Sequence, residues 1–228
     1  MGVFIPKHQK GVDSENDWPL HGLENIDEIQ EVYEMNYTHN WNQQFINNTK
    51  EFKNLDLALE IGCFEGLTSN YICDKLLSEN GKLICVDPLE NTYLSEKLTA
   101  KDEKNNKTVN SYFDGQYDRF IENTKHQERI SLWRMLSSVA IPRLLKEYKG
   151  LFGLIYVDGD HRAKGVYNDG VGAFSLCKEG GIIIFDDYQW GKEYRTNRPK
   201  TGIDKFLSEY VGRYRILHMD YQVVIMKL

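Results

Sequence analysis

Short apolar runs alternate with amphipathic stretches along most of the chain, and this alternation narrows the fold more than any other feature. The runs lie at residues 56–62, 82–87, 130–135, 151–158 and 180–187. Helical periodicity lies between them, near residues 66–79, 113–126, 137–148 and 163–177. Buried strands that alternate with helices predict a parallel sheet with helices on both of its faces.

The two ends of the chain extend this pattern. Residues 201–211 are predicted as a further helix, and residues 214–220 and 221–228 as two strands so close together that only antiparallel pairing is open to them. Residues 23–52 also have helical spacing. We therefore predict an α/β fold, namely a doubly wound, Rossmann-like, seven-stranded sheet that is mostly parallel and ends in an antiparallel hairpin. An N-terminal arm and helical lid extension at residues 1–54 precedes the main domain at residues 55–228.

Composition excludes several classes of protein. A net charge of -6 in 228 residues argues against a nucleic-acid partner, which usually selects a basic face. The absence of a leader-like apolar core and of an apolar run near 18 residues predicts no membrane partner and a cytoplasmic location. The four cysteines are widely spaced and are expected to be reduced core residues. Whether the chain forms a homo-oligomer stays open.

The first strand ends in a glycine turn, LEIGCFEGLTSN, with Gly62 and Gly66. The second strand ends in Asp87, an acid that is well placed for the hydroxyls of an adenosine ribose. In open parallel sheets, ligands bind beyond the carboxyl ends of the strands. The pattern predicts a nucleotide-type ligand, with NAD as a chemical competitor. The alternative is a structural turn closed by a capping acid.

The fourth and fifth strands also end in acids, Asp158 on one and Asp186 with Asp187 on the other. Three carboxylates that converge at one sheet edge repel one another unless a cation compensates them. Oxygen ligands favour magnesium, manganese or calcium over zinc. The alternative is that one acid caps a helix and another pairs with Arg162 or Lys164.

The glycine turn, Asp87 and the C-terminal hairpin together resemble those of class I S-adenosylmethionine-dependent methyltransferases, and the resemblance covers residues 55–228. It implies that residues 55–228 are the methyltransferase domain and that S-adenosylmethionine is the cofactor. It places Glu60, Gly62 and Gly66 beside the methionine part and Asp87 on the ribose. It also implies that Ser137 and Ser138 contact the adenine, although serines at this point also cap helices.

The motifs DGDH and GGIIIFDDY resemble those of metal-dependent sugar O-methyltransferases of the macrocin O-methyltransferase type. This resemblance implies that Asp158, Asp186 and Asp187 bind magnesium or manganese. The family places a general base just after the first ligand, where this chain has both Asp160 and His161. We favour His161 as the base, because imidazole titrates near neutral pH and a nearby cation makes a carboxylate less basic.

The function implied is transfer of the methyl group of S-adenosylmethionine to a hydroxyl of a small-molecule or glycan acceptor, with a sugar hydroxyl favoured. A catechol or phenol acceptor is the alternative for an enzyme. A non-catalytic nucleotide-binding protein and an NAD-dependent reductase are alternatives of other classes. The polar stretch 88–112 and the aromatic residues Tyr188, Trp190 and Tyr194 are candidate acceptor contacts.

Overall fold

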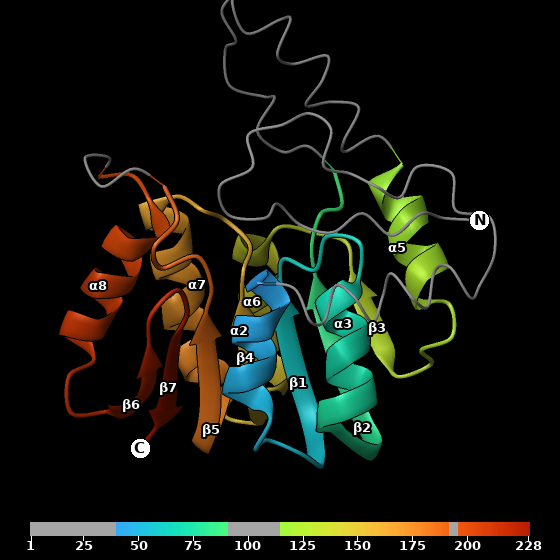
Figure 1. The fold of residues 1–228 in the computed structure, drawn as a ribbon, viewed down its shortest axis with the longest axis horizontal. Helices are drawn as coiled ribbons and strands as arrows, with labels where there is room; N and C mark the ends of the chain where they lie inside the picture. Colours follow the sequence, from blue (N-terminus) through green and yellow to red (C-terminus); the bar gives the residue numbers. More distant parts are fainter. Residues whose placement is uncertain (1–39, 91–114, 192–195) are drawn as a thin grey trace, which may run out of the picture.

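The computed structural model describes residues 40–90, 115–191 and 196–228. Their strands form one seven-stranded sheet in the order β3-β2-β1-β4-β5-β7-β6 (Figure 1). The strands are β1 (Leu55–Ile61), β2 (Leu77–Val86), β3 (Ile130–Trp133), β4 (Phe152–Val157), β5 (Cys177–Phe185), β6 (Tyr214–Met219) and β7 (Val223–Lys227). The predicted α/β fold with a seven-stranded sheet is confirmed.

The pairing of the strands is parallel from β1 to β5 and antiparallel at the C-terminal end. β1 lies between β2 and β4, and Leu59 of β1 is in register with Ile84 and Ile155. β7 is antiparallel to both β5 and β6. From β1 the sheet continues through β2 to β3 on one side, and from β4 it continues through β5 on the other side. The switch point where ligands bind in such sheets therefore lies between β1 and β4.

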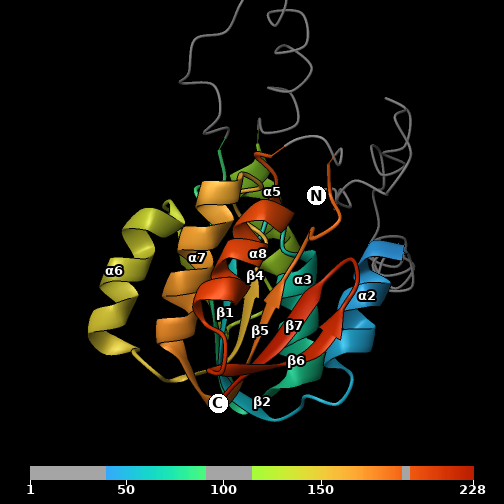
Figure 2. The same cartoon turned by 90° about the vertical axis from the view of Figure 1, so that its left-hand side faces the viewer.

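Helices cover both faces of the sheet, as the view along the sheet edge shows (Figure 2). One face carries α2 (Asn40–Thr49), α3 (Leu67–Tyr71) with the π-helical turn Ile72–Leu76, and α5 (Gln116–Thr124). The other carries α6 (Ser137–Glu147), α7 (Ala163–Leu176) and α8 (Pro199–Glu209). Within the described ranges, no helix has the length and apolarity needed to cross a membrane.

Each strand of the sheet's centre buries side chains on both faces, which explains the continuous apolar runs. On β1, Leu59 packs in the core beneath α6, α7 and α8, whereas Ala58 packs in the core beneath α2 and α3. Ile155 and Leu154 of β4 divide between the two cores in the same way. A sheet buried on both faces leaves only its strand ends for polar chemistry.

β2 and β5 begin earlier than predicted, at Leu77 and Cys177 instead of residues 82 and 180. In each case the first residues pair with a neighbouring strand before a register shift, between Leu55 and Leu57 for β2 and between Phe152 and Leu154 for β5. Residues 77–79 and 177 were predicted as the last residues of helices, at 66–79 and 163–177, and this part of the prediction is wrong. Polar residues are frequent at both strand starts, so the hydrophobic pattern did not predict strands there.

Part of the predicted N-terminal extension packs on the sheet. Of the helical stretch predicted at residues 23–52, the structure describes α2, and residues 1–39 lie outside the described part. Phe45 of α2 is 3% exposed, and its ring lies 5.7 Å from that of Tyr71 and 4.7 Å from that of Tyr156. α2 is therefore part of the core, and a domain boundary at residue 54 remains a prediction.

The cysteines Cys63, Cys73, Cys85 and Cys177 are free and buried, as predicted. Burial raises the pKa of Cys73 and of Cys177 to about 12 in each case, so both stay protonated near neutral pH.

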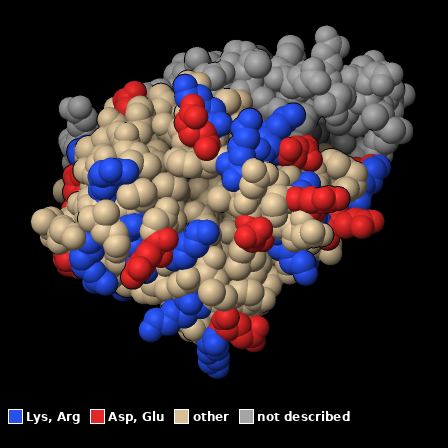
Figure 3. Space-filling model, turned by 90° about the horizontal axis from the view of Figure 1, so that it is seen from below, with Lys and Arg blue, Asp and Glu red and all other residues tan. Residues whose placement is uncertain are grey.

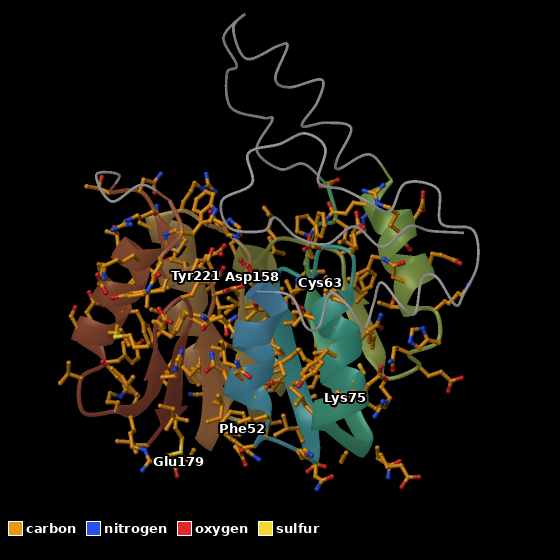
Figure 4. All side chains as sticks on the ribbon, in the orientation of Figure 1. Phe52, Cys63, Lys75, Asp158, Glu179 and Tyr221 are labelled. Atoms are coloured by element: carbon orange, nitrogen blue, oxygen red, sulfur yellow. The ribbon has the colours of Figure 1, made fainter. Side chains whose placement is uncertain are left out.

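The two ends of the sheet differ in the side chains they present. Cys63, Asp158 and Tyr221 lie near the end to which the parallel strands point, and Phe52, Lys75 and Glu179 lie near the opposite end (Figure 4). Basic and acidic side chains are interspersed over the face seen from below, which contains that opposite end (Figure 3).

Candidate functional site

The glycine turn after β1 has a left-handed backbone conformation at three residues, which residues other than glycine rarely adopt. Gly62, Phe64 and Gly66 all have positive φ, at 83°, 46° and 89°. Asp87, at the end of β2, holds the turn: Cys63 and Phe64 donate their backbone N–H groups to its Oδ2 at 2.9 and 3.0 Å. A carboxylate that accepts several backbone N–H groups stabilises a strained turn. Asp87 therefore has a structural function, and its contact with a ribose remains a prediction.

The two glycines are also required by close packing. A Cβ on Gly62 would lie 2.1 Å from the carbonyl oxygen of Asp158, and a Cβ on Gly66 would lie 2.5 Å from Thr124 of α5. Asp158 also donates its backbone N–H to the carbonyl of Ile61 at 2.8 Å. The glycine turn therefore touches the end of β4 directly.

Glu60 lies beneath the glycine turn and not on its open side. It is 1% exposed, and its Oε2 accepts hydrogen bonds from Ser69 Oγ of α3 at 2.5 Å and from Cys85 Sγ of β2 at 3.6 Å. These contacts connect the end of β1 to α3 and to β2. A contact of Glu60 with a methionine group remains a prediction.

Ser137 and Ser138 are the first two residues of α6. Ser137 is half-buried and hydrogen-bonded to the carboxyl of Asp169 on α7, whereas Ser138 is exposed. Leu136 occupies the N-cap position of α6, so neither serine is the capping residue. The predicted adenine contacts are untested, and Ser137 links α6 to α7.

Asp158, His161 and Asp187 form a compact group at the carboxyl ends of β4 and β5. One ligand-type atom from each lies within 4.8 Å of the others. His161 Nε2 is 3.5 Å from Asp158 Oδ1 and 3.2 Å from Asp187 Oδ2. Both carboxylates are buried, with Asp158 7% and Asp187 1% exposed. The convergence predicted for the ends of β4 and β5 is present for these two acids.

Asp186 belongs to a different set of contacts. Its carboxylate accepts hydrogen bonds from Tyr156 Oη at 2.5 Å, Gln222 Nε2 at 3.2 Å and the backbone N–H of Asp187 at 2.8 Å. Asp187 itself has a φ of 59°, and Tyr221 Oη donates to its Oδ1 at 3.0 Å. The group that can hold a metal ion thus contains Asp187 and His161, and Asp186 as a ligand remains a prediction.

Asp160 and His161, the two candidate bases, have different side-chain partners although they are adjacent in the chain. Asp160 accepts hydrogen bonds from Arg162 Nε at 2.9 Å, Nη2 at 2.8 Å and the backbone N–H at 2.9 Å. A Cβ on Gly165 would overlap the Asp160 carboxylate, which therefore lies over the first turn of α7. His161 is directed at the two buried carboxylates.

Three residues of the site were missed in the sequence: Tyr156, Tyr221 and Gln222. Burial raises the pKa of Tyr156 and of Tyr221, and the neighbouring aspartates raise it further. Both phenols therefore stay protonated, and they donate hydrogen bonds to Asp186 and Asp187, which we call the aspartate pair. Tyr221 and Gln222 just precede β7, so only the position of β7 beside β5 brings them to the site. Tyr156 is an unexpected polar side chain within an apolar strand, which is a signal visible in the sequence.

Some predicted contacts lie outside the described residues. They are residues 91–112 of the polar stretch and Tyr194. Tyr188 and Trp190 follow the aspartate pair directly, and Trp190 is 44% exposed.

A family model and a viral protein match this chain by sequence. A family model described as "Methyltransferase domain" matches residues 59–188. The uncharacterized protein R132 of Acanthamoeba polyphaga mimivirus is 31% identical over 166 residues, which are 72% of this chain. The chain spans 65% of that relative's length.

Solved structures share the fold at low sequence identity. A putative O-methyltransferase of Klebsiella pneumoniae has a TM-score of 0.58 at 14% identity, covering 90% of this chain and 91% of its own. The O-methyltransferase of Bacillus cereus has 0.56 at 15%, covering 91% and 93%. TomG of Streptomyces achromogenes has 0.53 at 15%, covering 76% and 74%.

The matched region runs from within β1 to Tyr188, so it contains the glycine turn, Asp87 and the Asp158–His161–Asp187 group. It spans more than half of the chain. The chain therefore belongs to the methyltransferase domain family.

Proposed function

We propose that the protein is a divalent-metal-dependent O-methyltransferase that moves the methyl group of S-adenosylmethionine to a hydroxyl of a sugar or glycan. One observation carries the proposal. The glycine turn and the Asp158–His161–Asp187 group touch each other at the switch point of the sheet, where Gly62 lies against the Asp158 carbonyl. A methyl donor bound at the glycine turn would therefore lie next to an acceptor bound at the Asp158–His161–Asp187 group.

S-adenosylmethionine is the proposed cofactor. The TomG structure contains S-adenosylmethionine and the Bacillus cereus structure contains S-adenosylhomocysteine, on the same fold. In this chain the ribose would lie against Asp87, whose carboxylate already fixes the turn. Charge-assisted hydrogen bonds from ribose hydroxyls would then contribute to binding.

A divalent cation fits the acidic group. Asp158 and Asp187 offer two buried carboxylates that lie close enough together to hold a single ion, and the His161 imidazole lies beside them. Carboxylate oxygens favour magnesium or manganese. When bound, such an ion lowers the pKa of a coordinated hydroxyl and fixes its oxygen. Asp158 and Asp187 would hold the ion. Asp186 would orient Asp187, because its carboxylate accepts the backbone N–H of Asp187.

His161 is the proposed general base. Its Nε2 faces Asp158 and Asp187, and these carboxylates would stabilise the imidazolium that forms when it takes the hydroxyl proton. Asp160 is hydrogen-bonded to the Arg162 guanidinium and is therefore the less favoured candidate. The acceptor oxygen would then attack the sulfonium methyl in line, and the protein would act by positioning both groups.

The first test is cofactor binding by isothermal titration. Wild type should bind S-adenosylmethionine and not NADH, which separates the proposal from an NAD-dependent reductase. Asp87→Ala should lose about 1.5–3 kcal/mol of binding free energy, because a charge-assisted hydrogen bond is removed. Asp118→Ala, an exposed acid on α5, is the matched control. Equal affinity of Asp87→Ala and wild type would contradict the ribose assignment.

The second test is transfer of labelled methyl from S-adenosylmethionine to a panel of methyl pyranosides and catechols. Turnover should appear on the pyranosides, vanish on exhaustive chelation and return with magnesium or manganese. His161→Ala should lower kcat by about 10²–10⁴-fold with little change in cofactor or metal affinity, and Asp160→Asn should be milder. Transfer that survives chelation would refute the metal, transfer to catechols alone would refute the sugar, and cofactor binding without any transfer would indicate a non-catalytic protein.

A further inference from the structure

Tyr188 and Trp190, two of the aromatic residues that follow the aspartate pair, have different environments. The Tyr188 ring is packed against the core, and its hydroxyl is hydrogen-bonded to Asp204 at 2.8 Å and to Lys200 of α8. The Lys200 ammonium also lies over its ring, 4.1 Å from the centroid. Through these contacts Tyr188 fixes the segment that follows the aspartate pair to α8.

Trp190 is held at the rim of the site by its backbone. Its N–H donates to the carbonyl of Asp187 at 2.9 Å, which closes a tight turn directly after β5. Its indole is 44% exposed and meets the His161 ring edge to face, with the ring centroids 5.2 Å apart. Because His161 Nε2 is 3.2 Å from Asp187, the indole borders the group that would orient the acceptor.

Polar residues precede Trp190 in the chain and share the loop of His161, whose ring the indole meets. The Asp160–Arg162 ion pair lies on the same loop as His161. Gln189 is hydrogen-bonded to Asp220, and Arg198 lies beside Gly191, the residue after Trp190. Trp190 is thus an exposed aromatic residue that is flanked by polar residues in the described part of the chain. Sites for flat apolar ligands usually enclose them between apolar walls.

We infer that Trp190 is the platform on which the acceptor's pyranose ring stacks. A pyranose has one face of C–H groups, which suits an indole, and a rim of hydroxyls, which suits polar neighbours. Stacking on Trp190 would place a ring hydroxyl beside His161 and the two carboxylates. The location of transfer rests on the proposed function, whereas the binding of the sugar to Trp190 does not require turnover.

The test is direct binding, by saturation-transfer NMR and intrinsic fluorescence, of a panel of methyl hexopyranosides and methyl 6-deoxyhexopyranosides. The proteins are wild type, Trp190→Phe, Trp190→Ala and Tyr117→Ala, each at saturating manganese with and without S-adenosylmethionine. Tyr117 is a matched control, because it is an exposed aromatic residue, 37% accessible, on α5. Because Trp190 is largely at the surface, its variants are expected to fold, and their cofactor affinity should match wild type.

Wild type should bind at least one pyranoside, with saturation strongest at its C–H face. The dissociation constant should rise about tenfold or more in Trp190→Ala, rise less in Trp190→Phe, and stay unchanged in Tyr117→Ala. Pyranoside binding that is equal in Trp190→Ala and wild type would refute the inference, as would a wild type that binds no pyranoside on the panel. Methyl transfer, scored separately, decides the proposed function: sugar binding without transfer would contradict that function and leave Trp190 supported.

Discussion

Asp169 is a buried carboxyl that the proposed chemistry does not use. It lies on α7, is 2% exposed, and is hydrogen-bonded to Ser137. Among the described residues, its Oδ2 has no hydrogen-bond partner. Burial raises the pKa of Asp169 to about 6, against the opposing effect of Ser137.

The raised pKa of Asp169 predicts a specific pH dependence of stability. At a pH well below the ordinary value of 3.8 the carboxyl is protonated in both the folded and unfolded states, so its burial is not penalised. As pH rises toward 6, the unfolded state releases the proton first, and folding loses on the order of 3 kcal/mol from this group. Asp169→Asn cannot ionise. Its free energy of unfolding, measured with urea from pH 4.5 to 8, should therefore fall less steeply than that of wild type.

The same urea series distinguishes titration from packing. If Asp169→Asn only disturbed packing, its unfolding free energy would differ from wild type by one amount at every pH. Parallel curves would therefore contradict the pKa assignment. Ser137→Ala is a useful companion, because loss of the hydrogen bond that lowers the pKa of Asp169 should move the wild-type transition to higher pH.

At the scale of elements, α5 is fastened to the glycine turn. Arg119 Nε lies 2.6 Å from Glu65 Oε1, and the Glu65 side chain is fully buried. Asn123 of α5 also donates to the Glu65 carbonyl at 2.9 Å. Because Gly66 packs directly on α5, the turn has little room to move. The conformation of the turn thus depends on a neighbouring helix as well as on its glycines.

Arg119→Gln should therefore impair both folding and cofactor binding. It leaves the Glu65 carboxylate buried beside a neutral partner, which should cost on the order of 3 kcal/mol in unfolding free energy. The double variant Glu65→Gln with Arg119→Gln removes both charges and should recover part of that loss. Chemical denaturation and titration with S-adenosylmethionine measure the two effects. No recovery in the double variant would mean that packing, and not the ion pair, holds α5 in place.

At the scale of the whole molecule, α2 connects the N-terminal region to the aspartate pair. Asn48 Nδ2 donates to Gln222 Oε1 at 3.0 Å, and Gln222 Nε2 donates to Asp186 at 3.2 Å. Phe45 of the same helix fills the core beside Tyr156, whose hydroxyl also donates to Asp186. Residues far apart in the chain thus share one layer above β4, β5 and β7.

Phe45→Ala should destabilise the protein by about 3–5 kcal/mol, because it removes a buried aromatic ring and leaves a cavity between α2 and the sheet. Lys50→Ala, at an exposed position just after α2, should change the unfolding free energy by less than about 0.5 kcal/mol. Calorimetry or urea unfolding of both variants measures the contrast. A small loss in Phe45→Ala would show that α2 is a dispensable extension, as a boundary at residue 54 would have it.

The sequence by itself determined the elements and the edge of the sheet where polar groups gather. Apolar runs such as 151–158 are long enough only for buried strands, and Asp158 and the pair Asp186 and Asp187 mark where two of them end. The hydrophobic pattern carries this information because it indicates which residues of an element are buried, whichever other element they pack against. It misjudged the starts of β2 and β5, where a register shift lets polar residues pair.

Only the tertiary structure decided which polar groups meet. Asp186 and Asp187 are adjacent in the chain, but Asp186 meets Tyr156 and Gln222 whereas Asp187 meets His161. The division depends on β7 lying beside β5, which brings residues 221 and 222 to the aspartate pair. A hydrogen bond or an ion pair needs two partners at a fixed distance, and strand order sets that distance for residues far apart in the chain. The sequence names the candidate groups, and the packing of the sheet selects among them.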